Sequence, residues 1–311
     1  MIAALSVDLD EIPHYHAIHG LPPPSAQSAH LVYQRALGRI EDFARAHELP
    51  VTFFAIGVDL TGQAGAGAGA GAALRVLALR GHAVENHSLC HRYDFSRLPP
   101  AQIAAEVEDG AAAIAAAVGS RPTGFRAPGY LVSDAVFDAL DEAGVAFDSS
   151  VFPCPPYWAA KAAVLAAMRL RGRASSSRCD DPRGILAPPR PDPPGARWFQ
   201  RGGARRFVEL PVQVTPRARL PFIGTSLAMA GERGARWLAR SLRGEPLVNL
   251  ELHGIDFLDA SDGLEALIPV QPDLRKPLGA RLDALSAAVA ELGRQGRAWV
   301  RLDEAAAAHA S

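Results

Sequence analysis

Two histidines that lie four residues apart are the first candidate for chemistry in this sequence. His87 and His91 frame the segment His-Ser-Leu-Cys-His, directly after a predicted strand over 82–86. If this segment is helical, both imidazoles point from one face and can hold one divalent cation at about 2.0–2.1 Å per bond. The alternative is a pair of surface histidines. No glutamate follows the first histidine, which excludes the His-Glu-x-x-His pattern of zinc proteases.

Two aspartates end the first predicted strand. Asp8 and Asp10 lie two residues apart, so both carboxylates project on one side of the chain. They could simply cap the loop that follows. Alternatively, one carboxylate joins the two histidines on a metal ion and the other accepts a proton from water. Two histidines and one carboxylate with open coordination positions form a hydrolytic metal site.

Two further polar residues end predicted strands. Arg126 stands before a Pro-Gly turn, and its planar guanidinium suits a bidentate clamp on a carboxylate such as Asp8. His253 follows an apolar strand and precedes a glycine. Arg126 could also be a surface charge and His253 a structural histidine. As a member of a set of polar residues at strand ends, His253 becomes a candidate general acid.

The elements that must position these residues alternate between strands and helices. Short apolar strands are predicted at 2–8, 51–56, 82–86, 124–126, 146–149, 207–214, 247–252 and 298–302. Helices are predicted at 28–47, 74–80 and 101–118. This alternation predicts an α/β fold with a parallel sheet, open or closed into a barrel, in which ligands bind beyond the carboxyl ends of the strands.

Two segments depart from this pattern. Residues 63–73 alternate Gly and Ala, which predicts a flexible low-complexity loop. Residues 154–206 are rich in Pro, Arg and Gly, with one predicted helix at 158–170. We expect the latter to be a surface insertion within a single catalytic domain that spans residues 1–311.

Composition excludes several classes of protein. The 311 residues include 32 Lys and Arg against 33 Asp and Glu, and a net charge of −1 argues against a polybasic nucleic-acid binder. Cys90, Cys154 and Cys179 form no Cys-x-x-Cys pair and cannot build a disulfide framework. The chain has no apolar stretch of about 18 residues and no basic, apolar start, which predicts a cytoplasmic protein without a transmembrane segment.

The order of these motifs resembles the polysaccharide deacetylase family, also known as the NodB-homology domain or carbohydrate esterase family four. The aspartate pair is followed by Gly-His-x-x-x-Asn-His-Ser-x-x-His at 81–91, by Gly-Phe-Arg-x-Pro at 124–128 and by a strand that ends in His253. The resemblance covers residues 1–150, resumes at 207–254 and 298–304, and leaves about 154–206 unmatched.

The resemblance implies a distorted (β/α) barrel of the NodB type with its site at the carboxyl ends of the strands. It also implies a divalent metal, zinc in the first place, held by Asp10, His87 and His91. The implied reaction removes an N-acyl group, acetyl or formyl, from an amino sugar or a lipid-linked amino sugar.

The resemblance further implies roles for individual residues. Asp8 matches the base, Arg126 the residue that orients the base, and His253 the acid that protonates the leaving amine. The family's adjacent Asp-Asp is here Asp-Leu-Asp, which leaves open which of Asp8 and Asp10 is base and which is ligand. Asp148 matches a supporting residue, or is structural.

A second departure concerns the donor to the oxyanion. The family's Arg-Pro-Pro-Tyr is here Arg-Ala-Pro-Gly-Tyr at 126–130, so the backbone N–H that holds the oxyanion belongs to Gly129 or Tyr130.

Two alternatives to this function stay open. One is a small-molecule amidohydrolase on the same fold without sugar specificity, and the other is a catalytically silent carbohydrate-binding relative. Trp158, Trp198 and Phe199 in the insertion suggest a lipid-linked substrate and a peripheral membrane contact, or they only pack the insertion down. The sequence predicts no nucleic-acid partner and gives no oligomeric state.

Three histidines after Asp10 are further candidates near the site. His14, His16 and His19 lie in a predicted polar loop. They could contact substrate, act as additional metal ligands, or only make that loop polar.

Overall fold

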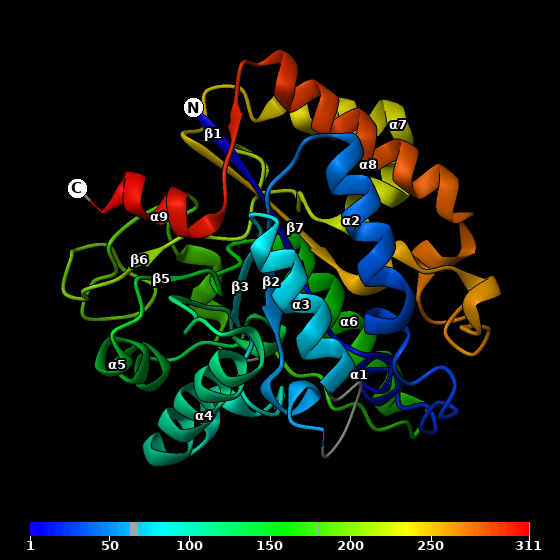
Figure 1. Ribbon diagram of the computed structural model, residues 1–311, viewed down its shortest axis with the longest axis horizontal. Coiled ribbons are helices and arrows are strands. Elements are labelled where there is room, and N and C mark those ends of the chain that lie inside the picture. Colours follow the sequence, from blue (N-terminus) through cyan, green and yellow to red (C-terminus); the bar gives the residue numbers. More distant parts are fainter. Residues whose placement is uncertain (63–67, 180, 311) are drawn as a thin grey trace.

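Eight parallel strands form one curled sheet in the computed structural model, which describes residues 1–62, 68–179 and 181–310 (Figure 1). The strand order is β6-β5-β4-β3-β2-β1-β7, and β8 pairs with the start of β1. The strands are β1 (Ile2–Asp8), β2 (Val51–Ala55), β3 (Ala83–Asn86), β4 (Gly124–Phe125), β5 (Phe147–Asp148), β6 (Val208–Glu209), β7 (Leu247–His253) and β8 (Ala298–Trp299). The predicted distorted (β/α) barrel is confirmed.

Strand β1 pairs with β2, β7 and β8 and sets the position of the site. Its register with β7 runs from Ile2↔Leu247 to Asp8↔His253, and its register with β2 ends at Asp8↔Phe54. Most of β1 and β2 is buried, as expected of parallel strands that are covered on both faces. The pairing places Asp8 and His253 side by side at the carboxyl edge.

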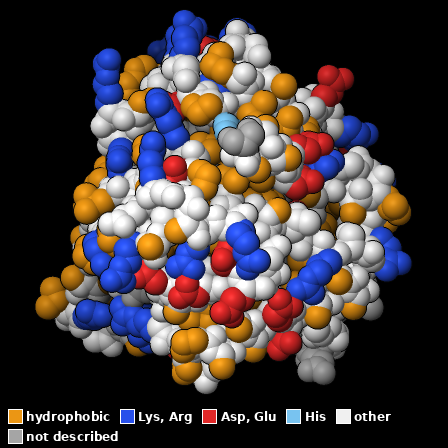
Figure 2. All heavy atoms as spheres, turned by 90° about the vertical axis from the view of Figure 1, so that its left-hand side faces the viewer, with side chains coloured by type: hydrophobic (Ala, Val, Ile, Leu, Met, Phe, Trp, Pro, Cys, Tyr) orange, Lys and Arg blue, Asp and Glu red, His pale blue; other side chains and the backbone are white. Residues whose placement is uncertain are grey.

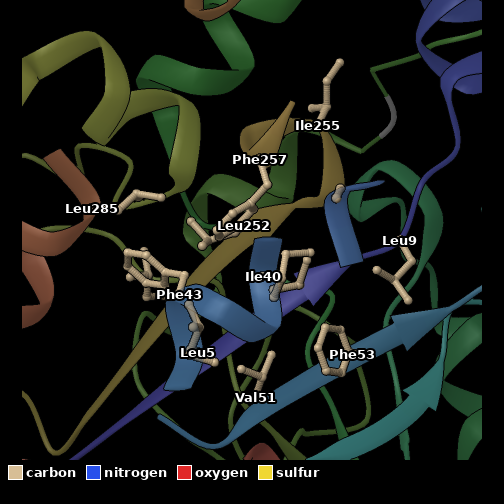
Figure 3. Packing of buried hydrophobic residues seen from close by; sticks show 14 of the residues in the cluster. Leu5, Leu9, Ile40, Phe43, Val51, Phe53, Leu252, Ile255, Phe257 and Leu285 are labelled. Atoms are coloured by element: carbon tan, nitrogen blue, oxygen red, sulfur yellow. The ribbon is translucent and has the colours of Figure 1, made fainter. Parts of the chain in front are cut away.

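Helices pack around the sheet. They are α1 (Ile12–Ile18), α2 (Leu37–Ala46), α3 (Ala68–Leu79), α4 (Pro100–Val118), α5 (Asp134–Ala143), α6 (Pro155–Leu170), α7 (Gly224–Ser241), α8 (Leu278–Arg294) and α9 (Leu302–His309). Figure 3 shows Ile40 and Phe43 of α2 packed toward Leu5, Phe53 and Leu252 of the sheet. Burying each such side chain contributes about 1.5–3 kcal/mol to stability, which holds the strand ends in place.

Side chains bridge the gap between the β6 region and β7. Asn249 Nδ2 donates to the carbonyl oxygens of Leu210 and Pro211 at 3.2 Å each. The predicted strand over 207–214 is therefore wrong in its length, because ladder pairing ends at Glu209 and Pro211 has no N–H to donate. These two hydrogen bonds from the Asn249 side chain connect β7 to the chain after β6, where backbone pairing is absent among the described residues.

The predicted loop over 63–73 is wrong for residues 68–73, which begin α3. Alanine has the highest helix propensity, and here it outweighs the intervening glycines. Residues 63–67 lie outside the described part of the chain.

The insertion packs against the body of the protein. Trp198 and Ala187 are buried in the same cluster as Phe207, Phe125 and Phe137. The aromatic residue Trp198 therefore holds the insertion down. The assignment of the whole chain to one catalytic domain stays a prediction.

The surface mixes both signs of charge. Figure 2 shows basic and acidic side chains interspersed on one face of the molecule, which agrees with the near-zero net charge. Within the described residues, no helix is both long and apolar enough to cross a membrane. All three cysteines are free thiols.

Gly124 of β4 tests how tightly the sheet is packed. A Cβ at this position would overlap the ring of Phe147 on β5, so Gly124→Ala is expected to destabilise the fold by about 1–3 kcal/mol through overpacking. The midpoint of urea unfolding measures the effect. Gly293→Ala in α8 is the matched control, because no atom lies within 4 Å of its added Cβ. Equal midpoints for the two variants would contradict the packing described here.

Candidate active site

Asp10, His87 and His91 converge in a buried group beyond the ends of β1 and β3. Asp10 Oδ1 lies 3.2 Å from His87 Nε2 and 3.3 Å from His91 Nε2. The segment that carries the two histidines is not helical: residues 87–91 form a loop. Left-handed backbone at Ser88 (φ 65°) and His91 (φ 52°) turns this loop so that the two rings still meet, 4.7 Å between centroids.

This group has the donor set of a divalent-metal site. Asp10 Oδ1 and both ring nitrogens of His91 are buried without a hydrogen-bond partner among the described residues. His87 Nδ1 donates to the Arg126 carbonyl at 2.8 Å, which leaves the Nε2 lone pair for a metal. All three ligand atoms lie within 4.8 Å of one another. Because burying an unpaired carboxylate is costly, a bound cation fits these residues.

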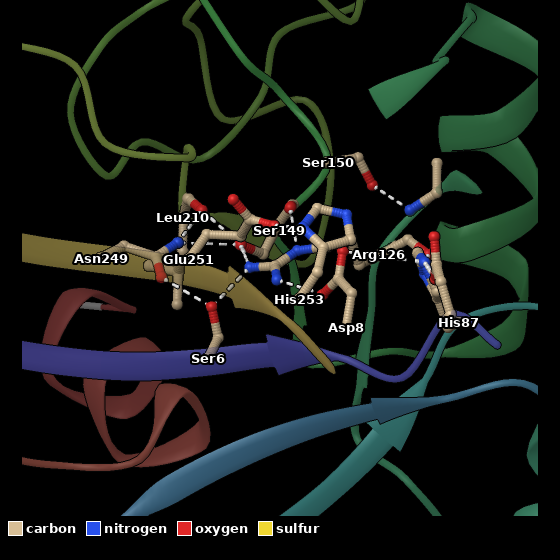
Figure 4. Close-up of polar contacts among 12 residues, drawn as sticks. Ser6, Asp8, His87, Arg126, Ser149, Ser150, Leu210, Asn249, Glu251 and His253 are labelled. Atoms are coloured by element: carbon tan, nitrogen blue, oxygen red, sulfur yellow. Dashed lines mark hydrogen bonds and ion pairs between the residues drawn. The ribbon is translucent and has the colours of Figure 1, made fainter. Parts of the chain in front are cut away.

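Asp8 is held by Arg126 in the sheet interior. Arg126 Nη1 donates to Asp8 Oδ1 at 2.6 Å, and its guanidinium also donates to Ser149 and to Ser6 Oγ (Figure 4). The face of the guanidinium lies over the Phe54 ring, 4.1 Å from its centroid. Asp8 Oδ2 is 3.7 Å from His87 Nε2. Asp8 therefore keeps one oxygen turned toward the metal ligands, as a base would.

His253 is paired with Glu251, a residue that the sequence interpretation missed. His253 Nδ1 lies 2.8 Å from Glu251 Oε1, and Glu251 is fully buried. Burial alone would lower the pKa of His253, but the Glu251 carboxylate and the nearby aspartates Asp8 and Asp10 hold that pKa well above its ordinary value. Since alternate strand residues share one face, the alternation in β7 could have identified Glu251.

The turn at 128–130 lines the same pocket with Gly129 and Tyr130. Both Gly129 (φ 62°) and Tyr130 (φ 61°) have left-handed backbone. The Tyr130 N–H already donates to the Ala127 carbonyl at 3.1 Å. Of the two predicted oxyanion donors, the Gly129 N–H is therefore the better placed.

Asp148 lies behind the site rather than in the pocket. Its carboxylate accepts from Ser150 Oγ at 2.6 Å, and Ser150 Oγ accepts from the Ala127 N–H at 2.7 Å. Burial and the neighbouring Asp148 raise the pKa of Glu209 well above its ordinary value, so Glu209 keeps its proton and can donate a hydrogen bond to Asp148. Asp148 thereby fixes the backbone next to Arg126, a positioning role.

The three histidines after Asp10 lie on or next to helix α1, not in a loop. The His14 ring packs on His91, 4.4 Å between centroids, and burial lowers the His14 pKa to about 3, so it is neutral. His16 Nδ1 lies 2.5 Å from the Pro22 carbonyl oxygen. His19 bonds to Gln271 at 3.0 Å, and both residues line the pocket.

A pocket of about 230 Å³ joins these groups. Asp8, Asp10, His87, Glu251 and His253 line its floor. Its walls carry four tyrosines, namely Tyr15, Tyr93, Tyr130 and Tyr157. Each tyrosine presents an aromatic ring and a hydroxyl group. Such a lining suits a ligand that is a ring with polar substituents.

A comparison with known families identifies the fold that carries this site. The family profile described as polysaccharide deacetylase matches residues 32–147. The predicted resemblance to polysaccharide deacetylases is confirmed. The matched residues include the two histidines of the candidate metal site and Arg126.

Solved structures with the polysaccharide deacetylase fold cover nearly the whole chain. A candidate polysaccharide deacetylase from Mycobacterium smegmatis superposes with a TM-score of 0.56 at 16% identity, over 99% of this chain and 89% of its own. A CE4 family pseudoenzyme from Bacillus anthracis gives 0.50 at 11% identity, over 98% of this chain and 65% of its own. At these identities the likeness shows the fold alone. Among curated proteins no match was found.

Proposed function

We propose that this protein is a metal-dependent hydrolase that removes an N-acyl group, acetyl or formyl, from an amino sugar. One observation carries the proposal: one pocket is lined by two residues of a metal donor set, by a carboxylate held by an arginine, and by a histidine held by a glutamate. We further propose that the whole chain forms one catalytic domain, with residues 154–206 as an insertion.

The candidate metal ligands are Asp10, His87 and His91. A divalent cation there, zinc in the first place, would lower the pKa of water and polarise the amide carbonyl. Asp8 accepts the proton of the attacking water at Oδ2, because Oδ1 is occupied by Arg126.

Two further groups of the pocket, Gly129 and His253, act on the tetrahedral intermediate and on the leaving amine. The Gly129 N–H donates to the oxyanion that forms as the carbonyl carbon becomes tetrahedral. His253, protonated beside Glu251, gives its proton to the leaving amine. Without that proton the amine would be a poor leaving group and the amide would re-form.

Release of acetate or formate from a panel of N-acylated amino sugars tests this function. The zinc-loaded protein is expected to release the acid, chelation to abolish the release, and zinc to restore it. His91→Ala should lose both bound metal and activity, whereas His47→Ala, at the end of α2, should keep both. Full activity after chelation, or no release from any sugar with the metal bound, would contradict the proposal.

The alternatives differ in what they predict for the same panel. A small-molecule amidohydrolase would hydrolyse simple acyl amides as fast as the sugars. A catalytically silent carbohydrate-binding relative would release nothing from any member of the panel. The Bacillus anthracis structure, described as a pseudoenzyme, is an example of an inactive protein with this fold. We disfavour the silent relative because every role is filled by a suitable side chain, including Asp8 and His253.

A lipid-linked sugar is a narrower version of the proposed substrate. Exposed Val164 and Leu170 on α6, beside the basic Arg169 and Arg171, support a peripheral contact with an anionic membrane. A cytoplasmic location stays a prediction.

A further inference from the structure

The insertion forms part of the pocket lining. Helix α6 and the chain that follows it, residues 155–177, are called the strap from here on. The strap contributes Tyr157, Lys161 and Ser177 to the pocket lining. Figure 1 shows α6 and α1 next to each other beyond the carboxyl ends of the strands.

One end of the strap is fixed on the turn that carries the oxyanion donor. Tyr157 packs against Phe152 and Tyr130, with ring centroids 4.8 and 5.9 Å apart. Trp158 Nε1 donates to the Phe152 carbonyl at 2.8 Å. Lys161 Nζ lies 3.5 Å from the Gly129 carbonyl oxygen. These contacts seat α6 directly against the reacting end of the pocket.

The other end of the strap is tied to α1. Three consecutive carbonyl groups at the end of this helix accept hydrogen bonds from the strap, and the first of them also accepts from the Gly20 N–H at 3.2 Å. Ser176 N donates to Ala17 at 3.2 Å, Ser175 Oγ to Ile18 at 2.5 Å, and Arg173 Nη2 to His19 at 2.6 Å.

The close approach of the two segments depends on a glycine. Gly20 has left-handed backbone (φ 60°), and a Cβ there would overlap the carbonyl oxygen of Ala174. The strap and α1 are thus fitted to each other as a continuous wall.

This wall leaves room for one small unit. The pocket volume of about 230 Å³ is below the range of about 300–1,000 Å³ that is common for sites of drug-sized ligands. An interior unit of a polysaccharide carries a linkage on both sides and needs a groove that is open at both ends. Tyr157 and Ser177 of the strap and Ile18 and His19 of the α1 end all line the pocket, and the bonds between the two segments join this part of its lining.

We propose that the strap makes this enzyme specific for a free or chain-terminal N-acylated amino sugar and excludes interior units of a polymer. This inference rests on the proposed function and narrows its substrate class.

Oligomers of N-acetylglucosamine and of N-acetylgalactosamine, from the monomer upward, test the strap. The zinc-loaded wild type is expected to release at most one acetate per chain, whatever the length of the chain. The double variant Arg173→Ala/Ser175→Ala, which removes two ties to α1 without touching the pocket lining, is expected to release more than one. Arg171→Ala, an exposed arginine in the same segment, is the matched control and should behave as the wild type.

The outcomes separate this inference from the function on which it rests. Release from interior units by the wild type, or an unchanged pattern in a double variant with native circular dichroism, would overturn the role of the strap and leave the deacetylase proposal standing. If the double variant does not fold, the single variant Ser175→Ala is tested instead. An unchanged pattern of acetate release in that variant would likewise overturn the role of the strap. No acetate from the monomer or any oligomer would contradict both.

Discussion

Asp8→Asn is expected to lower kcat by about 10²- to 10⁴-fold, the usual contribution of a general base, with KM little changed. Asparagine has nearly the same shape and can still accept the hydrogen bond that Arg126 now donates at 2.6 Å. It cannot take a proton from water at neutral pH. Because Asp8 is distinct from the donor set of Asp10, His87 and His91, the variant should keep its bound metal. The measurement is steady-state kinetics on protein of known metal content.

The same substitution should also lower stability. Arg126 is completely buried, and removing its counter-charge is expected to cost about 3–5 kcal/mol. Rates are therefore compared per folded, metal-loaded molecule, at a temperature well below the lowered Tm.

Asp59→Asn is a suitable control for Asp8→Asn. Asp59 is also buried, does not line the pocket, and burial together with Asp10 raises its pKa to about 7. Its replacement by a neutral amide should change kcat little. If Asp8→Asn kept more than about a tenth of the wild-type kcat, Asp8 would not be the base.

Much of the site could be predicted because its residues end parallel strands. Asp8, Arg126 and His253 were each expected at a strand end, and the sheet register brings Asp8 and His253 together as neighbours. The convergence of His87 and His91 was expected on the condition that their segment is helical, which it is not. Their meeting depends on two left-handed backbone positions in a loop, which residue spacing does not reveal.

The strap could not be predicted, because its contacts link segments that are far apart in the chain. Arg173 and Ser175 bond to residues more than 150 positions earlier, and no local pattern marks the carbonyl groups that receive them. The Gly-Ala segment was misjudged for the opposite reason, since local helix propensity was the stronger signal there.

Glu251→Gln is expected to move the alkaline limb of the pH profile of kcat to lower pH. His253 must be protonated to deliver a proton, so activity falls as pH rises through its pKa. In the wild type the Glu251 carboxylate, 2.8 Å away, holds this pKa well above its ordinary value against the opposing effect of burial. With a neutral glutamine, burial dominates, the pKa falls, and less of His253 is charged at neutral pH. An alkaline limb at the same pH in both proteins would show that Glu251 does not control the acid.

His253→Ala should lower kcat by about 10²- to 10⁴-fold for an amino sugar, which has a strongly basic leaving amine. For a nitrophenyl acetate ester the loss should be much smaller, because nitrophenolate is a stable anion and departs without a proton. A histidine that only supported the fold would affect both substrates equally. A general acid must discriminate between them, because its contribution is the proton itself. The ratio of the two losses, measured on the same metal-loaded preparation, therefore distinguishes a proton donor at the end of β7 from a structural histidine.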